Sequence, residues 1–325
     1  MNLYLILFDS APYFKPFQDL AGERNFHAFG QISNCFTTTS VISLLTGKMP
    51  SDLEEGGIGY ESEFAAGFPA SGKWPWENEL LLSLLEEEGW AVEIHTDNPF
   101  FHDVISQRFT IKYGDIHSQD YIKGIQKTDG KNKISFILYN TYHDAIGGKV
   151  SYQEAQDATN KCLSYWDFNQ QDSLFWLFAD HGDFSKITHH IDPVGFMTWA
   201  LMKDNTADPI IPHTDLISIR DFYRTVLEKL RIKINDPIIK AESKSVTSPL
   251  DLDRVFFIED SRSFIDVHNS TAFSAVTIDS WKGLLEDYTY SQATVFKHMN
   301  QDLTTHGCPD KSSQLRDLLN KRFKL

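Results

Sequence analysis

Residues 173–183 read SLFWLFADHGD, an unbroken apolar run that ends in Asp180 and His181. A run of this kind, without polar alternation, is typical of a strand that is buried on both faces of a parallel sheet. Residues 3–8, LYLILF, have the same character and run into Asp9. Ligands bind beyond the carboxyl ends of the strands in open parallel sheets. These three polar residues are therefore the first candidates for chemistry.

Strands and helices alternate through most of the chain. The apolar patterns predict further strands at 91–97, 134–141 and 196–203, and helices at 77–88, 152–168 and 214–230. Such alternation is typical of parallel strands joined by crossover helices. The sequence therefore predicts an α/β fold with a mostly parallel sheet sandwiched by helices.

The pattern changes after residue 230, where the segment 231–253 is loop-like. The remaining sequence predicts strands at 254–260, 271–278 and 291–299 without long helices between them, and a closing helix near 312–323. We therefore expect a catalytic domain over residues 1–245 and a small C-terminal antiparallel α+β subdomain over residues 246–325.

The chain is acidic, with 30 Lys and Arg against 45 Asp and Glu and a formal net charge of −15. This balance disfavours a nucleic-acid-binding surface and broad binding to anionic lipid. It leaves room for a small anionic substrate, provided that a local cation receives it. The sequence contains no information on oligomeric state.

The N-terminal segment has no basic region or small-residue cleavage site, and no stretch approaches the roughly 18 apolar residues of a membrane span. The three cysteines, Cys35, Cys162 and Cys308, are odd in number and widely spaced. That usage fits a reducing compartment better than a disulfide framework. We expect a cytoplasmic protein without a membrane anchor.

Two interpretations fit an acidic residue that follows a strand. Taken singly, Asp9 and Asp180 would be turn residues, because aspartate is common in turns. Taken together, and with His181 beside Asp180, they favour a metal site held rigidly at the ends of two buried strands.

Residues 37–47, TTTSVISLLTG, form a third element, in which small hydroxyl residues lead into an apolar helical stretch. This pattern predicts a helix N-terminus. Such an end offers free N–H groups and a positive dipole to a phosphate or sulfate group. A metal bound to a threonine there would lower the pKa of its hydroxyl and make it a nucleophile.

These three elements, in this order, resemble the alkaline phosphatase superfamily and, within it, the sulfatase-like branch. Residues 37–47 resemble the sulfatase signature C-x-P-S-R-x-S-L-L-T-G, and residues 178–183, FADHGD, resemble its S-D-H-G-E motif. The segments HTDLISIRDFYRTVL (213–227) and VFKHMNQD (295–302) extend the resemblance over nearly the whole chain. It implies the alkaline phosphatase-like fold and an enzyme that acts on ester bonds.

Three departures from the sulfatase pattern indicate the branch. Thr37 stands where sulfatases carry the cysteine that becomes formylglycine, Val41 replaces an arginine, and Ser10 replaces the second aspartate of a pair. The threonine is similar to that of phosphoethanolamine transferases, lipoteichoic acid synthases and nucleotide phosphodiesterases, where it takes up a phosphoryl group. The resemblance therefore implies a phosphate ester rather than a sulfate ester.

Carried over by position, the resemblance implies a primary metal site made of Asp9, Thr37, Asp180 and His181. One histidine with carboxylates and an alkoxide favours Zn²⁺ or Mn²⁺ over the all-oxygen cage of Ca²⁺. One divalent ion is expected at this site, and a second site is left open.

Further histidines are candidates for catalysis, a second metal or substrate binding. The resemblance places His189 or His190 on the loop that returns after the DHG motif, and the sequence does not choose between them. His213 precedes the 214–230 segment and is a distal candidate.

His143 and Asp144 follow the expected 134–141 strand, at a place where the family carries a substrate or second-metal ligand. Gly148 stands where a further histidine would complete the D-x-x-G-H pattern of the diesterases. The resemblance therefore leaves a complete two-metal centre open.

The predicted function is metal-dependent, sulfatase-like hydrolysis of a small anionic phosphomonoester or phosphodiester through a phosphothreonine on Thr37. Water, deprotonated with help from His143, His189 or His190, would release the phosphoryl group. A sulfuric ester hydrolase and a phosphoryl-group transferase are alternatives of the same fold. A catalytically silent relative that binds a ligand or serves as a scaffold is a third alternative.

Overall fold

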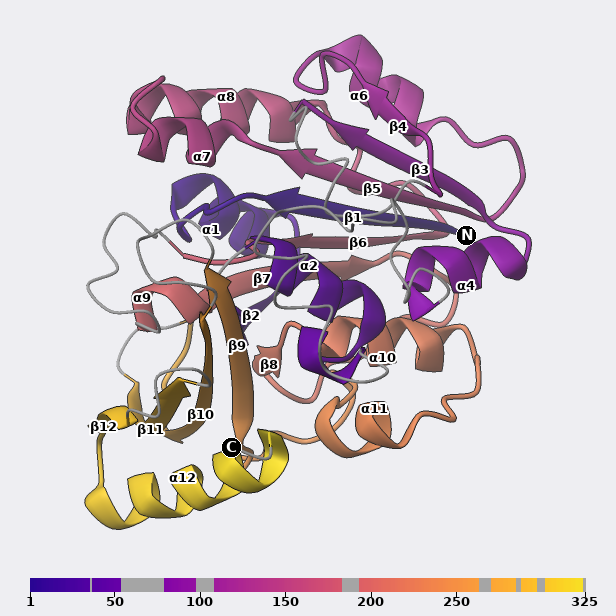
Figure 1. Ribbon diagram of the computed structural model, residues 1–325. Helices are drawn as coiled ribbons and strands as arrows, with labels where there is room; N and C mark the ends of the chain where they lie inside the picture. Colours follow the sequence, from indigo (N-terminus) through magenta and orange to yellow (C-terminus); the bar gives the residue numbers. More distant parts are fainter. Residues whose placement is uncertain are drawn as a thin grey trace.

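Figure 1 shows the computed structural model, which describes residues 1–35, 37–53, 79–97, 108–182, 193–262, 270–284, 288–296 and 302–323. Eight strands form the large sheet, in the order β4-β3-β5-β1-β6-β7-β2-β8. Their bounds are β1 (Asn2–Phe8), β2 (His27–Ile32), β3 (Ala91–Thr96), β4 (Ile111–Tyr113), β5 (Lys133–Tyr139), β6 (Ser173–Phe178), β7 (Met197–Asp204) and β8 (Leu216–Ser218). Only β7 among these strands runs antiparallel to its neighbours, β6 and β2.

Helices cover both faces of this sheet (Figure 1). One face carries α1 (Lys15–Glu23), α6 (Gln119–Gln126), α7 (Thr141–Ile146) and α8 (Tyr152–Tyr165). The other carries α2 (Thr37–Thr46), α4 (Leu81–Glu87), α10 (Asp221–Lys229) and α11 (Pro237–Glu242). Two short helical segments, η1 (Pro50–Asp52) and α9 (Pro193–Phe196), lie in the connections. The structure confirms the predicted α/β fold with helices on both sides of a mostly parallel sheet.

Strand β1 shows why continuous apolar runs form the centre of the sheet. Leu3, Leu5 and Leu7 point into the core on one face, and Tyr4, Ile6 and Phe8 point into the core on the other. All six side chains are at most 1% exposed. The alternation of side chains along a strand therefore requires apolar residues at every position, because neither face is in contact with water.

One predicted helix is partly wrong. The segment 214–230 begins with the short strand β8, and the helix α10 starts only at Asp221. Leu216 and Ile217 are buried where β8 pairs with β2. The backbone N–H of Ser218 donates to Asp221 Oδ2. Pairing with β2 therefore outweighs the helical periodicity of these residues.

A second sheet follows, with the order β12-β11-β10-β9 and antiparallel pairing throughout. Its elements are β9 (Phe256–Arg262), β10 (Ser270–Ser280), β11 (Thr289–Phe296), β12 (Asp302–His306) and the closing helix α12 (Pro309–Phe323). Leu315 and Leu319 of α12 pack on one face. Phe256 and Ile258 on the other face pack against residues at the end of β2 and beside β7. The predicted antiparallel α+β unit is confirmed, and its boundary at residue 246 stays a prediction.

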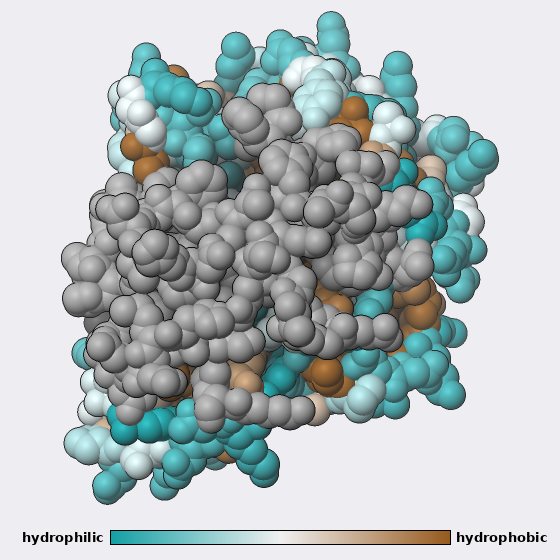
Figure 2. Space-filling model, in the orientation of Figure 1, coloured by the Kyte–Doolittle hydropathy of each residue, from teal (hydrophilic) through white to brown (hydrophobic). Residues whose placement is uncertain are grey.

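The described surface is largely hydrophilic around the rim seen in Figure 2, where apolar residues form small patches. No helix in the described ranges combines the length and the apolar character that crossing a bilayer requires. The long apolar runs of the sequence are instead strands of the large sheet.

Candidate metal centre

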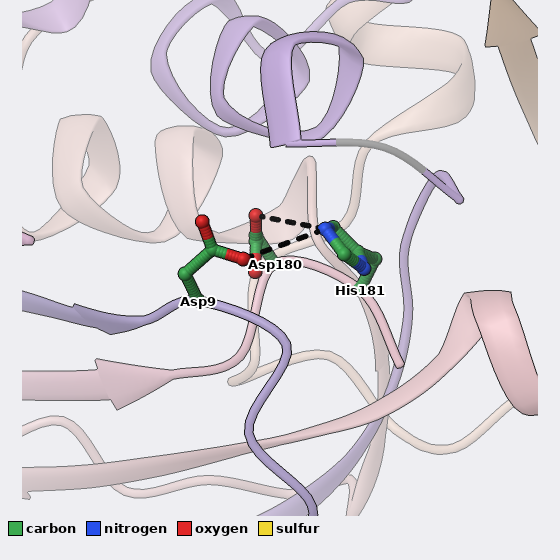
Figure 3. A group of neighbouring side chains, drawn as sticks. All are labelled: Asp9, Asp180 and His181. Atoms are coloured by element: carbon green, nitrogen blue, oxygen red, sulfur yellow. Dashed lines mark ion pairs between the residues drawn. The ribbon is translucent and has the colours of Figure 1, made fainter. Parts of the chain in front are cut away.

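Asp9, Asp180 and His181 lie together at the carboxyl ends of β1 and β6 (Figure 3). The two strands are parallel neighbours, with Leu7 beside Phe178, so the residues that follow them meet at one edge of the sheet. The three residues are 3%, 0% and 1% exposed, respectively. Two strand ends that are distant in sequence thus place three potential ligands in a water-poor site.

The ligand atoms of these side chains fit a small divalent cation. His181 Nε2 lies 3.6 Å from Asp9 Oδ1 and 3.6 Å from Asp180 Oδ2. One ligand atom from each residue lies within 4.8 Å of the others. Bonds of about 2.0–2.2 Å from zinc to nitrogen and oxygen place the ligands of a tetrahedral site roughly 3.3–3.6 Å apart. The group needs little movement to close around an ion.

The tautomer of His181 is set by a neighbouring carbonyl group. Its Nδ1 lies 2.7 Å from the carbonyl oxygen of Gly182, which can only accept a hydrogen bond. Nδ1 therefore carries a proton, and Nε2 is the ring nitrogen that faces the two carboxylates. A backbone acceptor on the far nitrogen is the usual way in which proteins orient a metal-binding histidine.

Gly182 has a steric reason to be glycine. A Cβ atom added there would lie 1.7 Å from the carbonyl oxygen of Val194, and the Gly182 N–H donates to the Gly195 carbonyl oxygen at 2.8 Å. Any side chain at position 182 would push this backbone away and carry the acceptor of His181 with it. The glycine of the DHG motif is therefore required by packing.

Positive charge would stabilise the two buried carboxylates of this site, Asp9 and Asp180. Burial first, and then the charge of Asp180, raise the pKa of Asp9 to about 7, although His181 and a hydrogen bond from Ser10 act in the opposite direction. Asp180 Oδ2 is buried and accepts no hydrogen bond within the described part of the chain. A divalent ion would supply the charge and the bonds that these two buried acids lack.

Thr37 approaches this group from α2. It is the first residue of the helix, it is half-buried, and its Oγ1 lies 3.1 Å from His181 Nε2. The predicted helix start at residue 37 is therefore confirmed. With Nε2 unprotonated, as a metal ligand must be, the Thr37 hydroxyl is the donor in this contact.

Asn34 holds the turn that delivers Thr37. Its side-chain amide donates to the Thr39 carbonyl oxygen at 2.9 Å and to Ser43 Oγ at 3.0 Å. Its Oδ1 accepts from the backbone N–H of Glu259 in β9 at 2.9 Å. The small sheet therefore contacts the start of α2 directly, and the two sheets jointly fix the position of Thr37.

Ser10 is a member of the centre that the sequence patterns did not single out as a contact residue. It is 1% exposed, its Oγ donates to Asp9 Oδ1 at 2.8 Å, and its backbone N–H donates to Asp180 Oδ1 at 3.1 Å. Its φ is +58°, in the left-handed region. An Asp-Ser pair directly after a buried strand was the available sequence signal, but it does not reveal this backbone conformation.

His143 and Asp144 lie near the centre but outside the group of three. They belong to α7, directly after β5, whose carboxyl end adjoins that of β1. Partial desolvation of its ring, followed by the charge of His181, lowers the pKa of His143 although the residue as a whole is exposed. Asp144 pairs with Lys149 at 2.7 Å. These two residues therefore border the site.

The remaining candidates lie elsewhere. β7 is antiparallel to both β6 and β2, so β2 and its parallel neighbour β8 run in the same direction as β1 and β6. His213 precedes β8 and therefore lies toward the amino ends of these strands, whereas Asp9 and Asp180 lie at the carboxyl ends. Its backbone N–H donates to the Val246 carbonyl oxygen. The structure does not bring His213 to the group of three. His189 and His190 lie outside the described residues.

No protein-family model and no curated protein matches this chain. Solved structures do resemble it. A protein in the alkaline phosphatase superfamily from Vibrio parahaemolyticus has a TM-score of 0.55 and 15% identity, covering 99% of this chain and 86% of that one. The lipoteichoic acid synthase LtaP from Listeria monocytogenes has a TM-score of 0.52 and 14% identity, over 99% and 90%. Ps i-CgsB has a TM-score of 0.59 and 13% identity, over 99% and 92%. At these identities the likeness shows the fold: the chain has the alkaline phosphatase superfamily fold.

Proposed function

We propose that this chain is a divalent-metal-dependent hydrolase of small phosphate esters, with Thr37 as its nucleophile. One observation carries the proposal. The hydroxyl of Thr37 lies 3.1 Å from Nε2 of His181, the same atom that faces Asp9 and Asp180. The candidate nucleophile and the candidate metal ligands therefore meet at one atom, Nε2 of His181.

Asp9, Thr37, Asp180 and His181 would hold the ion, which when bound supplies positive charge that favours the threonine alkoxide and the charged phosphoryl oxygens. The donor set of one imidazole, two carboxylates and one hydroxyl supports Zn²⁺ or Mn²⁺ over Ca²⁺. Asp180 Oδ2 accepts no hydrogen bond from the described residues, which supports a cation of either kind.

In the first half-reaction, Thr37 Oγ1 attacks phosphorus and its proton passes to solvent water. The Oγ1–P bond forms, the bond from phosphorus to the leaving oxygen breaks, and the leaving alkoxide takes up a proton. Thr37 is the first residue of α2, so the backbone N–H groups of the first helical turn and the positive end of the dipole would lie beside the transferred group. These groups favour the added negative charge.

In the second half-reaction, water attacks the phosphothreonine. The bond from water oxygen to phosphorus forms, the Oγ1–P bond breaks, and Thr37 recovers its proton. His143 is the candidate base among the described residues, because its lowered pKa keeps the imidazole neutral near pH 7 and able to accept a proton. The sum is ester plus water to alcohol plus phosphate.

The preference for a phosphate over a sulfate ester has support at position 41. Val41 is fully buried in the core beneath α2, among leucines and other apolar side chains. It therefore offers no cation to the ester at the point where the sulfatase pattern has arginine.

The test compares nitrophenyl phosphate, bis-nitrophenyl phosphate and nitrophenyl sulfate with metal-stripped protein to which Zn²⁺, Mn²⁺ or Ca²⁺ is returned. We expect hydrolysis of a phosphate ester with Zn²⁺ or Mn²⁺, and a loss of at least about 10³-fold in Thr37→Ala, as is typical when a covalent nucleophile is removed. Thr46→Val is the matched control, since Thr46 lies at the other end of α2, with its Oγ1 bonded to the Ile42 carbonyl oxygen.

Full activity of Thr37→Ala would overturn the nucleophile assignment. Faster hydrolysis of the sulfate than of both phosphates would replace the proposal with a sulfatase. A parallel assay with glycerol or ethanolamine as acceptor separates hydrolysis from transfer, because a transferase would pass the phosphoryl group to the alcohol in place of water.

A further inference from the structure

Ser10 touches all three members of the metal-ligand group. Its hydroxyl donates to Asp9 Oδ1 at 2.8 Å, and its backbone N–H donates to Asp180 Oδ1 at 3.1 Å. Its Oγ also lies 3.4 Å from Nδ1 and 3.3 Å from Nε2 of His181. Being almost equally far from both nitrogens, the oxygen packs against the ring and does not bond to one nitrogen.

The contact with Asp180 decides which carboxylate oxygen faces the ligand group. Oδ1 is engaged by the Ser10 N–H, which leaves Oδ2 pointing toward His181 Nε2 at 3.6 Å. The contact with Asp9 likewise uses the proton of the Ser10 hydroxyl and fixes the rotation of that carboxylate. Ser10 therefore orients both acids at once.

The backbone of Ser10 indicates that its side chain is needed. Ala11 N–H donates to the Phe8 carbonyl oxygen at 3.2 Å, so residues 8–11 form a tight turn, and Ser10 is its third residue at φ +58°. Glycine adopts this conformation without strain, whereas a residue with a Cβ does not. The turn alone would be better served by glycine. A serine there is explained by the two carboxylates and the imidazole that surround its hydroxyl.

We propose that Ser10 is the positioning residue of the metal centre, holding Asp9 and Asp180 in the orientation in which both acids bind one divalent ion. The inference rests on the metal site of the proposed function. Its action is on metal affinity, through the two carboxylates, and not on the reacting atoms.

The experiment titrates metal-stripped protein with Zn²⁺ in competition with a chelating dye. Both Ser10→Ala and Ser10→Gly remove the hydroxyl, so we expect each to bind Zn²⁺ about 10–100-fold more weakly than the parent chain, the usual effect of losing a group that orients ligands. Ser243→Ala is the matched control. Ser243 is fully buried, its Oγ donates to the Arg220 carbonyl oxygen, and both residues are distant in sequence from Asp9, Asp180 and His181. It should keep the parent affinity.

Thermal unfolding in a chelator separates positioning from folding. Ser10→Gly should unfold at a temperature no lower than Ser10→Ala, because glycine relieves the left-handed strain while both variants lack the hydroxyl. Weak Zn²⁺ binding by a Ser10→Gly protein of parental stability would support the proposal.

Unchanged Zn²⁺ affinity in both Ser10 variants, together with loss of binding in Asp180→Asn, would overturn this inference and leave the proposed metal site standing. Absence of Zn²⁺ binding by the parent chain would overturn the metal site and this inference with it.

Discussion

Asp180 and Asp221 are two buried aspartates that differ in the partners of their carboxylates. They are 0% and 1% exposed. Asp221 accepts from both terminal guanidinium nitrogens of Arg254, at 2.6 and 2.7 Å, and from the backbone N–H groups of Ser218 and Lys244, both at 2.8 Å. Asp180 accepts one hydrogen bond, and its Oδ2 accepts none within the described ranges.

This difference is the one expected between a structural acid and a metal ligand. Taking a carboxylate out of water costs several kcal/mol unless a counter-charge and hydrogen bonds replace the lost hydration. Arg254 and the backbone provide both for Asp221. Among the described residues, the neighbours of Asp180 are another carboxylate, Asp9, and the imidazole of His181. No lysine or arginine within the described residues pairs with Asp180, which is the property expected of a metal ligand.

The largest effect on stability is expected when the Asp221–Arg254 pair is broken. Asp221→Ala leaves the largely covered guanidinium of Arg254 without its carboxylate partner, and we expect a loss of about 3–5 kcal/mol in the free energy of unfolding. Urea unfolding in the presence of a chelator measures it, with Asp221→Asn as the milder variant if the alanine variant does not fold. A loss below about 1 kcal/mol would mean that this pair is not structural.

The corresponding substitution at the candidate metal centre should lower metal affinity rather than stability. Asp180→Asn removes one charged ligand, and we expect Zn²⁺ affinity to fall by at least about 100-fold, or roughly 2.7 kcal/mol. In chelator the variant should be at least as stable as the parent, because the amide removes the repulsion with Asp9. An Asp180→Asn protein that retains one bound ion by elemental analysis would contradict the assignment.

Metal addition should stabilise the two variants differently. Zn²⁺ at about 30 times its dissociation constant should raise the free energy of unfolding of the parent chain by about 2 kcal/mol. Asp221→Asn should show the same gain, and Asp180→Asn should show none. Equal gains in all three proteins would mean that the ion binds elsewhere.

The smallest effect is expected at the rim of the site. Lys149 pairs with Asp144 at 2.7 Å, but its side chain is 70% exposed. Solvent screens such a pair, so Lys149→Ala should cost at most about 1 kcal/mol of stability, and less at high salt. A cost as large as that of Asp221→Ala would show that this pair is not a surface pair.

The strands of the large sheet were largely predictable, because residues buried on both faces are apolar at every position, as Leu3–Leu7 show. The order of the strands was not. The residue pattern of 173–178 does not predict that this strand pairs with residues 2–8. The proximity of Asp9 to Asp180 depends on that pairing. For the same reason the sequence could not show that His213 lies at the opposite ends of the strands from Asp9 and Asp180.

Two features of the sites depend on geometry that no residue pattern records. The role of Ser10 follows from a φ of +58°, which serine adopts only when its surroundings hold it there. The pair of Asp221 with Arg254 joins a segment expected to be helical with one expected to be a strand, 33 residues apart. Side-chain partners at such separations come from tertiary packing, which periodicity does not describe.

Trapping the covalent intermediate tests the central claim most directly. The Zn²⁺-loaded protein is mixed with the nitrophenyl phosphate ester that it hydrolyses and quenched in acid, and the peptide that contains residues 37–47 is sequenced by mass spectrometry. The account predicts a phosphoryl group on Thr37 in the parent chain and in Thr46→Val, and none in Asp180→Asn. Continued turnover with an unmodified Thr37, or a phosphoryl group on another residue, would contradict it.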